Sequence, residues 1–141
     1  MERLIREFSR PRIWFAGYLC WFWLLFFLSS RPSFGPDMQT IPHLDKVIHA
    51  VYFTAGSTAL GLGLQLLRPK ISLRSLFMIL FFAALVVGRF DEWHQSHTPG
   101  RNGNDYGDLA ADGLGGVIGF FVAVRLFGFA RGQGLVARVG A

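Results

Sequence analysis

Cysteine and charge are the two things that this chain has little of. Its 141 residues include a single cysteine, Cys20, so no disulfide can form within the chain. Only 16% of the residues are charged, while 52% are hydrophobic, and this leaves too few polar side chains to cover a soluble domain of 15.8 kDa. The sequence also lacks internal repeats. The composition therefore indicates one domain that uses lipid as part of its solvent.

Long apolar runs make up most of the sequence. A helix that crosses a bilayer needs about 20 mostly apolar residues, and four such helices are expected at residues 13–29, 47–67, 73–95 and 108–129. The first run follows several arginines, as a secretory signal does, but its bulky aromatic core and the poor cleavage site at its end favour a retained helix. The predicted fold class is all-α: an antiparallel bundle of four transmembrane helices over residues 13–129.

The basic residues are unevenly distributed between the two sides of such a bundle. If residues 1–12, the loop at 68–74 and the tail at 130–141 share one side, that side and the adjoining helix end hold ten of the fourteen lysines and arginines. Lysine and arginine accumulate in cytoplasmic loops. Both termini are therefore expected in the cytoplasm and the acid-rich loops outside. The basic residues then act as topology determinants and lipid-headgroup contacts, and nucleic-acid binding is not expected.

Two of the expected helices carry small residues at every fourth position. Such stripes let helix backbones approach closely in a membrane. They consist of Ala55, Ala59 and Gly63 in the second helix, and of Ala111, Gly115, Gly119 and Ala123 in the fourth. The aromatic side chains of the first helix are expected to face lipid instead.

Polar residues are concentrated at the outward ends of the expected helices. The segment 91–112 alone holds five of the nine acidic residues and two of the four histidines. Residues four positions apart share a helix face, and three polar pairs have this spacing: Asp45 with His49, Asp91 with Gln95, and Asp108 with Asp112. Since all three pairs lie on the same side, we expect them to meet in one pocket at the outer membrane surface.

Several of these residues allow a structural role beside a functional one. Asp45 and Asp108 suit helix N-termini, where a carboxylate can cap the helix and complement its dipole. Lys46 can pair with a lipid headgroup or a carboxylate, and Tyr52 can anchor the chain at the membrane interface. His49 is either a hydrogen-bonded packing residue or part of a site.

Asp112 stands a full turn inside the fourth helix and therefore needs a partner. Arg101, Lys46 or His49 can supply one. A divalent metal could use Glu92, His94 and His97 together with the carboxylates of the fourth helix. However, no HExxH motif or cysteine pair fixes such a site, so neither a metal nor another cofactor is expected. A carboxylate–histidine acid/base pair is the most economical enzymatic interpretation.

These motifs resemble those of the VanZ-like family. The similarity covers residues 42–129 and rests on Asp45-Lys46-Val47-Ile48-His49 with Tyr52, on Asp91-Glu92 with Gln95, on Thr98-Pro99-Gly100-Arg101, and on Asp108-Leu109-Ala110 with the glycines at 115–119. Asp112 departs from the family pattern, because many members have asparagine there. The resemblance implies a small multi-pass protein of the bacterial cytoplasmic (inner) membrane. The founding member is associated with resistance to the glycopeptide teicoplanin.

Three functions follow from this interpretation, and whether the chain is an enzyme stays open. In the first, the pocket binds or modifies a lipid-linked or cell-envelope substrate and affects glycopeptide susceptibility. Its catalytic candidates are His49, Asp45, Glu92 and Asp112, and its substrate-binding candidates are Lys46, Tyr52, Asp91, Gln95, Arg101 and Asp108. Arg101 and Lys46 would hold an anionic group.

The second function is that of a non-catalytic membrane partner or shielding protein whose polar residues lock the helices together. The third is proton-coupled transport through His49 and Asp112, although no inverted repeat supports it. The expected partners are membrane lipids and either a lipid-linked cell-wall intermediate or a glycopeptide. A second copy of the chain, forming a homo-oligomer, is also considered.

Overall fold

Four helices make up the part of the chain that the structure describes. A computed structural model describes residues 7–31, 42–101 and 103–134. In these ranges the elements are α2 (Pro11–Ser29), α3 (Leu44–Leu67), α4 (Leu73–Gln95) and α5 (Tyr106–Gly132). All four are long and apolar enough to cross a membrane, which confirms the predicted all-α membrane bundle. The expected bounds of α4 are correct, and the other three helices extend two or three residues further at one or both ends.

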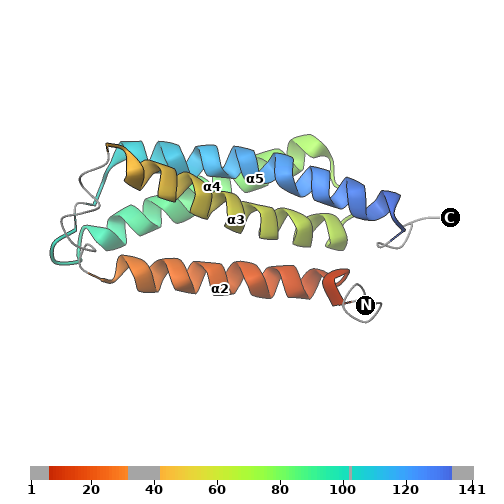
Figure 1. Cartoon of the computed structure of the whole chain (residues 1–141), viewed down its shortest axis with the longest axis horizontal. Helices are drawn as coiled ribbons and strands as arrows, with labels where there is room; N and C mark the ends of the chain where they lie inside the picture. The colour runs from red at the N-terminus through yellow and green to blue at the C-terminus, as the bar shows by residue number, and fades with distance from the viewer. Residues whose placement is uncertain (1–6, 32–41, 102, 135–141) are drawn as a thin grey trace.

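Successive helices run in opposite directions along one common axis (Figure 1). As a result α2 begins and α5 ends at one end of the bundle, while α2 and α4 end beside the starts of α3 and α5 at the other. Residues 1–6 of the predicted N-terminal segment, residues 32–41 of the first outward loop and residues 135–141 of the tail lie outside the described residues.

The start of α5 is capped by a side chain, whereas the start of α3 is not. The Asp105 carboxylate accepts a hydrogen bond of 2.6 Å from the Gly107 N–H. The residue before α3 is His43, whose backbone is left-handed with a φ of 63° and whose side chain makes no capping bond. Neither Asp45 nor Asp108 is the N-cap residue, although the Asp45 carboxylate accepts a hydrogen bond of 2.9 Å from the Lys46 N–H in the first turn of α3. Both lie in the first turn, where a carboxylate still interacts favourably with the helix dipole.

The most extensive helix contact joins α3 and α5. All four members of the small-residue stripe predicted for α5 are buried, and Gly115, Gly119 and Ala123 lie in this contact. A Cβ atom added at Gly119 would lie 2.6 Å from the Ser57 Cβ and 2.8 Å from the Thr54 carbonyl oxygen. A Cβ atom at Gly115 would lie 2.6 Å from the Ala50 carbonyl oxygen. Only glycine lets the two backbones come this close.

The small-residue stripe predicted for α3 is wrong. Ala55 is exposed and Ala59 is only partly buried. Gly63 is buried, but it faces Phe15 of α2. The residues of α3 that meet α5 have mixed spacing, and Gly61 continues the contact beside Ala123.

One tryptophan fastens α2 to α3. The Trp21 ring N–H donates to the Tyr52 carbonyl oxygen over 2.9 Å, and the Tyr52 hydroxyl donates to the Trp21 carbonyl oxygen, also over 2.9 Å. The two rings stack with centroids 5.3 Å apart. The expectation that aromatic residues of the first helix face lipid is thus wrong for Trp21, although Trp23 is 63% exposed and does face outward.

Candidate functional site

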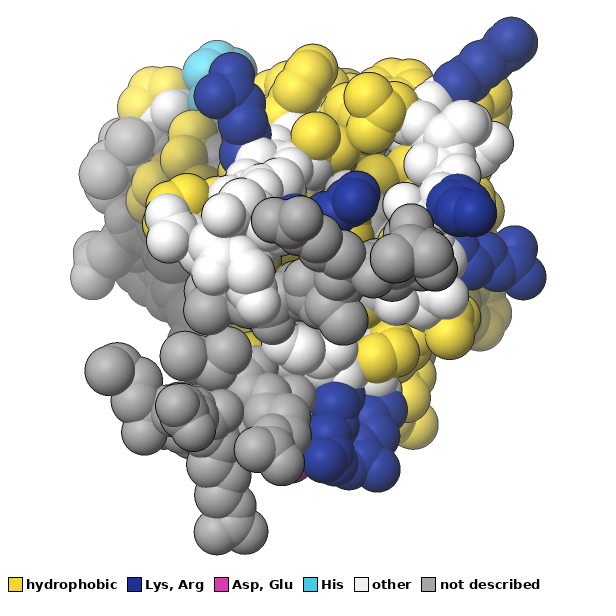
Figure 2. Space-filling view, turned by 90° about the vertical axis from the view of Figure 1, so that its right-hand side faces the viewer, with side chains coloured by type: hydrophobic (Ala, Val, Ile, Leu, Met, Phe, Trp, Pro, Cys, Tyr) yellow, Lys and Arg dark blue, Asp and Glu magenta, His cyan; other side chains and the backbone are white. Residues whose placement is uncertain are grey.

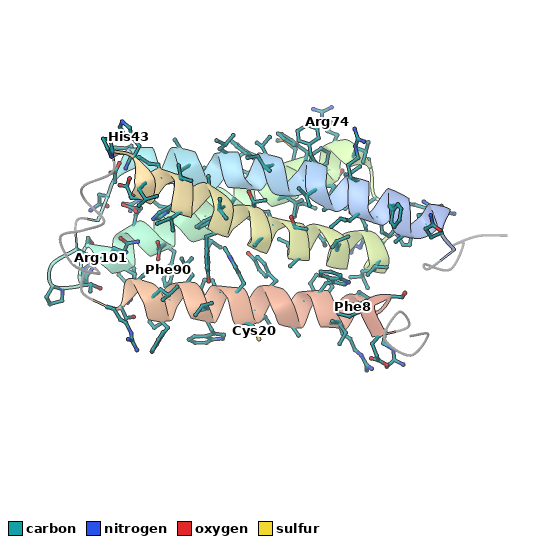
Figure 3. All side chains as sticks on the ribbon, in the orientation of Figure 1. Phe8, Cys20, His43, Arg74, Phe90 and Arg101 are labelled. Carbon is teal, nitrogen blue, oxygen red and sulfur yellow. The ribbon has the colours of Figure 1, made fainter. Side chains whose placement is uncertain are left out.

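Polar side chains gather at the end of the bundle where α3 and α5 begin. His43 and Arg101 mark this end in Figure 3. We define the polar cluster by the residues that lie here and bond to one another: Ser29, Asp45, Lys46, His49, Asp91, Glu92, Gln95, Asp105, Asp108 and Asp112. The opposite end, viewed in Figure 2, displays many lysine and arginine side chains and almost no acidic ones.

Lys46 is the centre of one half of the polar cluster. Its ammonium nitrogen lies 2.8 Å from Asp45, 2.9 Å from Asp105 and 3.0 Å from Asp108, in each case measured to a carboxylate oxygen. The hydrogen bond from Lys46, helped by the Gly107 N–H, lowers the pKa of the Asp105 carboxyl below its ordinary value of 3.8. Because all three ammonium donors serve the protein itself, the geometry argues against the predicted role of Lys46 in holding an anionic substrate group.

His49, which is partly buried, pairs with the buried Asp112 in the other half. The His49 Nδ1 lies 2.9 Å from the Asp112 Oδ1, and the Asp112 side chain is fully buried. Of the three partners proposed for Asp112, the structure selects His49. An ionised carboxylate can only accept, so with Asp112 ionised the ring proton of His49 lies on Nδ1, and a neutral ring then has its lone pair on Nε2. The Nε2 atom lies 4.0 Å from the Asp108 Oδ2.

Asp91 is held from two helices. The Ser29 hydroxyl at the end of α2 donates to its Oδ1 atom, and the Gln95 amide donates to its Oδ2 atom over 2.6 Å. The predicted pairing of Asp91 with Gln95 is confirmed. Ser29 was not among the predicted site residues, and a small polar residue at the end of an apolar run was the one signal for it.

Glu92 joins α4 to the loop before α5. The Asp105 backbone N–H donates to its Oε2 atom over 2.5 Å. Its other oxygen, Oε1, is buried and makes no hydrogen bond with any described residue, and the same holds for the Asp112 Oδ2. Buried polar atoms without partners are rare and costly, so an oxygen of this kind calls for a water, an ion or a ligand as its partner.

Arg101 and Tyr52 lie apart from these contacts. Within the described ranges Arg101 makes no ion pair with the cluster, and its buried Nε atom has no hydrogen-bond partner. The expectation that Arg101 could pair with Asp112 is therefore wrong, whereas its predicted role in binding an anion stays a prediction. The Tyr52 hydroxyl donates to Trp21 of α2, so its observed contacts are structural.

The histidines of the 91–112 segment do not join the carboxylates. His94 stacks on Phe26 with centroids 4.3 Å apart, and its Nε2 atom lies 2.9 Å from the Ser30 hydroxyl. His97 is exposed, and its Nδ1 atom lies 2.8 Å from the Trp93 carbonyl oxygen. Two other groups bring possible ligand atoms within 4.8 Å of one another: His49 with Asp91 and Glu92, and Asp45 with Asp105 and Asp108.

Polar residues from all four helices thus lie together at this end of the bundle. Asp105 was not among the predicted site residues, yet it contacts both Lys46 and Glu92. The family resemblance of the motifs stays a prediction. Comparisons of the chain with protein-family models, with curated proteins and with solved structures found no match.

Proposed function

We propose that this chain is a VanZ-like membrane protein whose polar cluster binds or modifies a lipid-linked or cell-envelope substrate. The observation that carries the proposal is the contact of the partly buried His49 with the buried Asp112, together with carboxylate oxygens of Asp112 and Glu92 that accept no hydrogen bond from a described residue. A cluster built only to hold helices together gains nothing from unsatisfied buried oxygens.

The His49 ring is arranged for general acid/base chemistry. Asp112 fixes the ring orientation and stabilises the imidazolium that forms when Nε2 takes a proton. A hydroxyl or a water at Nε2 would thereby become a nucleophile. Glu92 offers its free Oε1 atom as a second acceptor. Arg101, half-buried at the same end of the bundle, would hold an anionic group such as a phosphate.

The charge distribution supports an outward-facing cluster. The described lysines and arginines at the far end include Arg10, Arg68, Lys70 and Arg74, and this end is basic in Figure 2. Since basic ends stay in the cytoplasm, the polar cluster would face the periplasm or cell wall of a bacterium and the inner membrane would hold the chain. A lipid-linked cell-wall intermediate in the outer leaflet could then reach it.

The test is expression of the chain in a glycopeptide-sensitive bacterial host. Two quantities are measured: the minimal inhibitory concentration of teicoplanin and the mass spectrum of the lipid-linked intermediates. Wild type should shift at least one of them. His49→Gln and Asp112→Asn should remove the shift at an unchanged membrane level of the protein, while His97→Gln at the exposed histidine should retain it. The proposal fails if wild type shifts neither quantity, or if His49→Gln acts as wild type does.

A structural role of the cluster is the second candidate. The observation in its favour is the three-way bonding of Lys46, which ties the start of α3 to the start of α5. In that case the His49 and Asp112 variants would lower the membrane level of the protein along with any effect on the host. Measuring both quantities in the same cells separates the two candidates.

A further inference from the structure

We propose that His49, Asp91 and Glu92 form a binding site for a divalent transition-metal ion, with Zn²⁺ the best fit. The inference rests on the function proposed above and assigns a cofactor to the same cluster; with the ion bound, His49 Nε2 would be a ligand and a metal-bound water, instead of His49, would supply the acid/base group. It differs from the sequence-based expectation, which favoured no metal and considered the histidines of the 91–112 segment. The metal ligands would instead come from α3 and α4, with α5 supporting them.

The three side chains already lie at near-ligand spacing. One ligand atom of each lies within 4.8 Å of the other two. Ligands about 2.0–2.2 Å from a tetrahedral Zn²⁺ ion lie roughly 3–4 Å from one another. Small side-chain rotations would therefore close the site, and no backbone movement is needed.

The charges around this site call for a cation. Asp91, Glu92 and Asp112 are 2%, 1% and 0% exposed. No lysine or arginine of the described ranges forms an ion pair with any of the three, because Lys46 is engaged by other carboxylates. Buried carboxylates are stable only when paired, protonated or bound to a metal. A divalent ion would offset two of these charges at once.

The unsatisfied oxygen of Glu92 is a second, independent sign. Glu92 is almost fully buried, yet its Oε1 atom has no hydrogen-bond donor among the described residues. A carboxylate oxygen that ligates a metal needs no other donor. The close spacing of the three side chains does not by itself leave a buried oxygen without a donor, so the two observations are independent.

Each ligand is also oriented by a hydrogen bond from outside the site. The His49 Nδ1 bonds to Asp112, which directs the free Nε2 lone pair away from it. Asp91 accepts from the side chains of Ser29 and Gln95, and Glu92 accepts from a backbone N–H. Metal-binding histidines and carboxylates usually have such outer partners. The set of one imidazole and two carboxylates suits Zn²⁺ better than Mg²⁺, which favours oxygen ligands and retained water.

The other acidic group serves as an internal comparison. Asp45, Asp105 and Asp108 have the same close spacing, but the Lys46 ammonium lies within 3.0 Å of all three. A cation already occupies the centre of that group. Metal binding at this second position is therefore not expected.

Metal binding is tested on the purified full-length chain in detergent micelles. The protein is stripped with EDTA and dialysed against micromolar free Zn²⁺, and the bound metal is measured by mass spectrometry. Co²⁺ serves as a spectroscopic probe of the ligand geometry. We expect one ion per wild-type chain, loss of binding in His49→Gln and Glu92→Gln, and about 10–100-fold weaker binding in Asp112→Asn. His97→Gln should bind as wild type does, and excess Mg²⁺ should not compete.

Three results would overturn the metal site. They are an absence of stoichiometric binding by wild type, unchanged binding by Glu92→Gln, and loss of binding in His97→Gln, which would reveal an adventitious surface site. Circular dichroism of each variant checks that it is folded, and Asp112→Asn provides a further test if a ligand variant does not fold. The readout is independent of the host assay. Metal binding without any shift in the host would refute the proposed function alone, and a shift without metal binding would refute the site alone.

Discussion

The close approach of α3 and α5 can be measured with one pair of alanine variants. Gly119 and Gly128 both lie in α5. A Cβ atom at Gly119 would lie within 3.1 Å of atoms of Ser57, Thr54 and Thr58, two of which belong to the backbone. At Gly128 a Cβ atom would meet nothing within 4 Å. Replacing glycine by alanine raises helix propensity equally at both positions, by about 1 kcal/mol.

The difference between Gly119→Ala and Gly128→Ala therefore isolates the packing cost. Overpacking of a close contact costs about 1–3 kcal/mol, so Gly119→Ala should be less stable than Gly128→Ala by that amount. The free energy of unfolding is measured in mixed micelles by titration with sodium dodecyl sulfate, followed by circular dichroism. Equal stability of the two variants, within about 0.5 kcal/mol, would refute the packing of α5 against α3 described above.

Three further predictions concern the ends and edges of the bundle. Lys46→Met should lower the free energy of unfolding by about 1–3 kcal/mol, because the carboxylates of Asp45, Asp105 and Asp108 lose their cation. Adding Asp108→Asn to this variant should restore part of the lost free energy. Because the pKa of the Asp105 carboxyl is lowered in the folded state, its charge stabilises the fold above about pH 3.8, and this stabilisation is lost as the pH falls through the folded-state pKa. The Asn side chain of Asp105→Asn can still cap α5. The difference in melting temperature between wild type and Asp105→Asn should therefore shrink as the pH is lowered. Tyr52→Phe should cost about 0.5–1.5 kcal/mol in the same detergent titration, because the hydroxyl bond to Trp21 is lost, and no change would argue against that bond.

The sequence predicted helices well because their signals are local. The end of α4 at Gln95 was correct, since no helix-breaking residue precedes Pro99. The start of α3 was predicted three residues too late. The helix begins directly after His43, and no sequence pattern predicts the left-handed backbone of that residue. The inward position of Trp21 was missed for a different reason. In a helix that is apolar all round, hydrophobicity does not distinguish the lipid-facing side from the packed side.

The candidate site was predictable within helices and less so between them. The four-residue spacing correctly paired Asp91 with Gln95 and placed His49 and Asp112 at the same end of the bundle. Which cation meets which carboxylate depends on the path of the loop before α5 and on the relative rotation of the helices. That is why Arg101 was considered as a partner of Asp112, and why the contacts of Asp105 were not predicted.

The hydrogen bond between Ser29 and Asp91 connects α2 to the polar cluster. Among the described residues, α2 packs on α3 and α4 and has no comparable contact with α5, so it is the least enclosed helix and the most exposed to the surrounding lipid. Its last residue nevertheless holds a carboxylate of the polar cluster. If α2 tilts in response to bilayer thickness, Ser29 would move relative to Asp91. The thickness of the membrane would then change the position of the Asp91 carboxylate in the polar cluster.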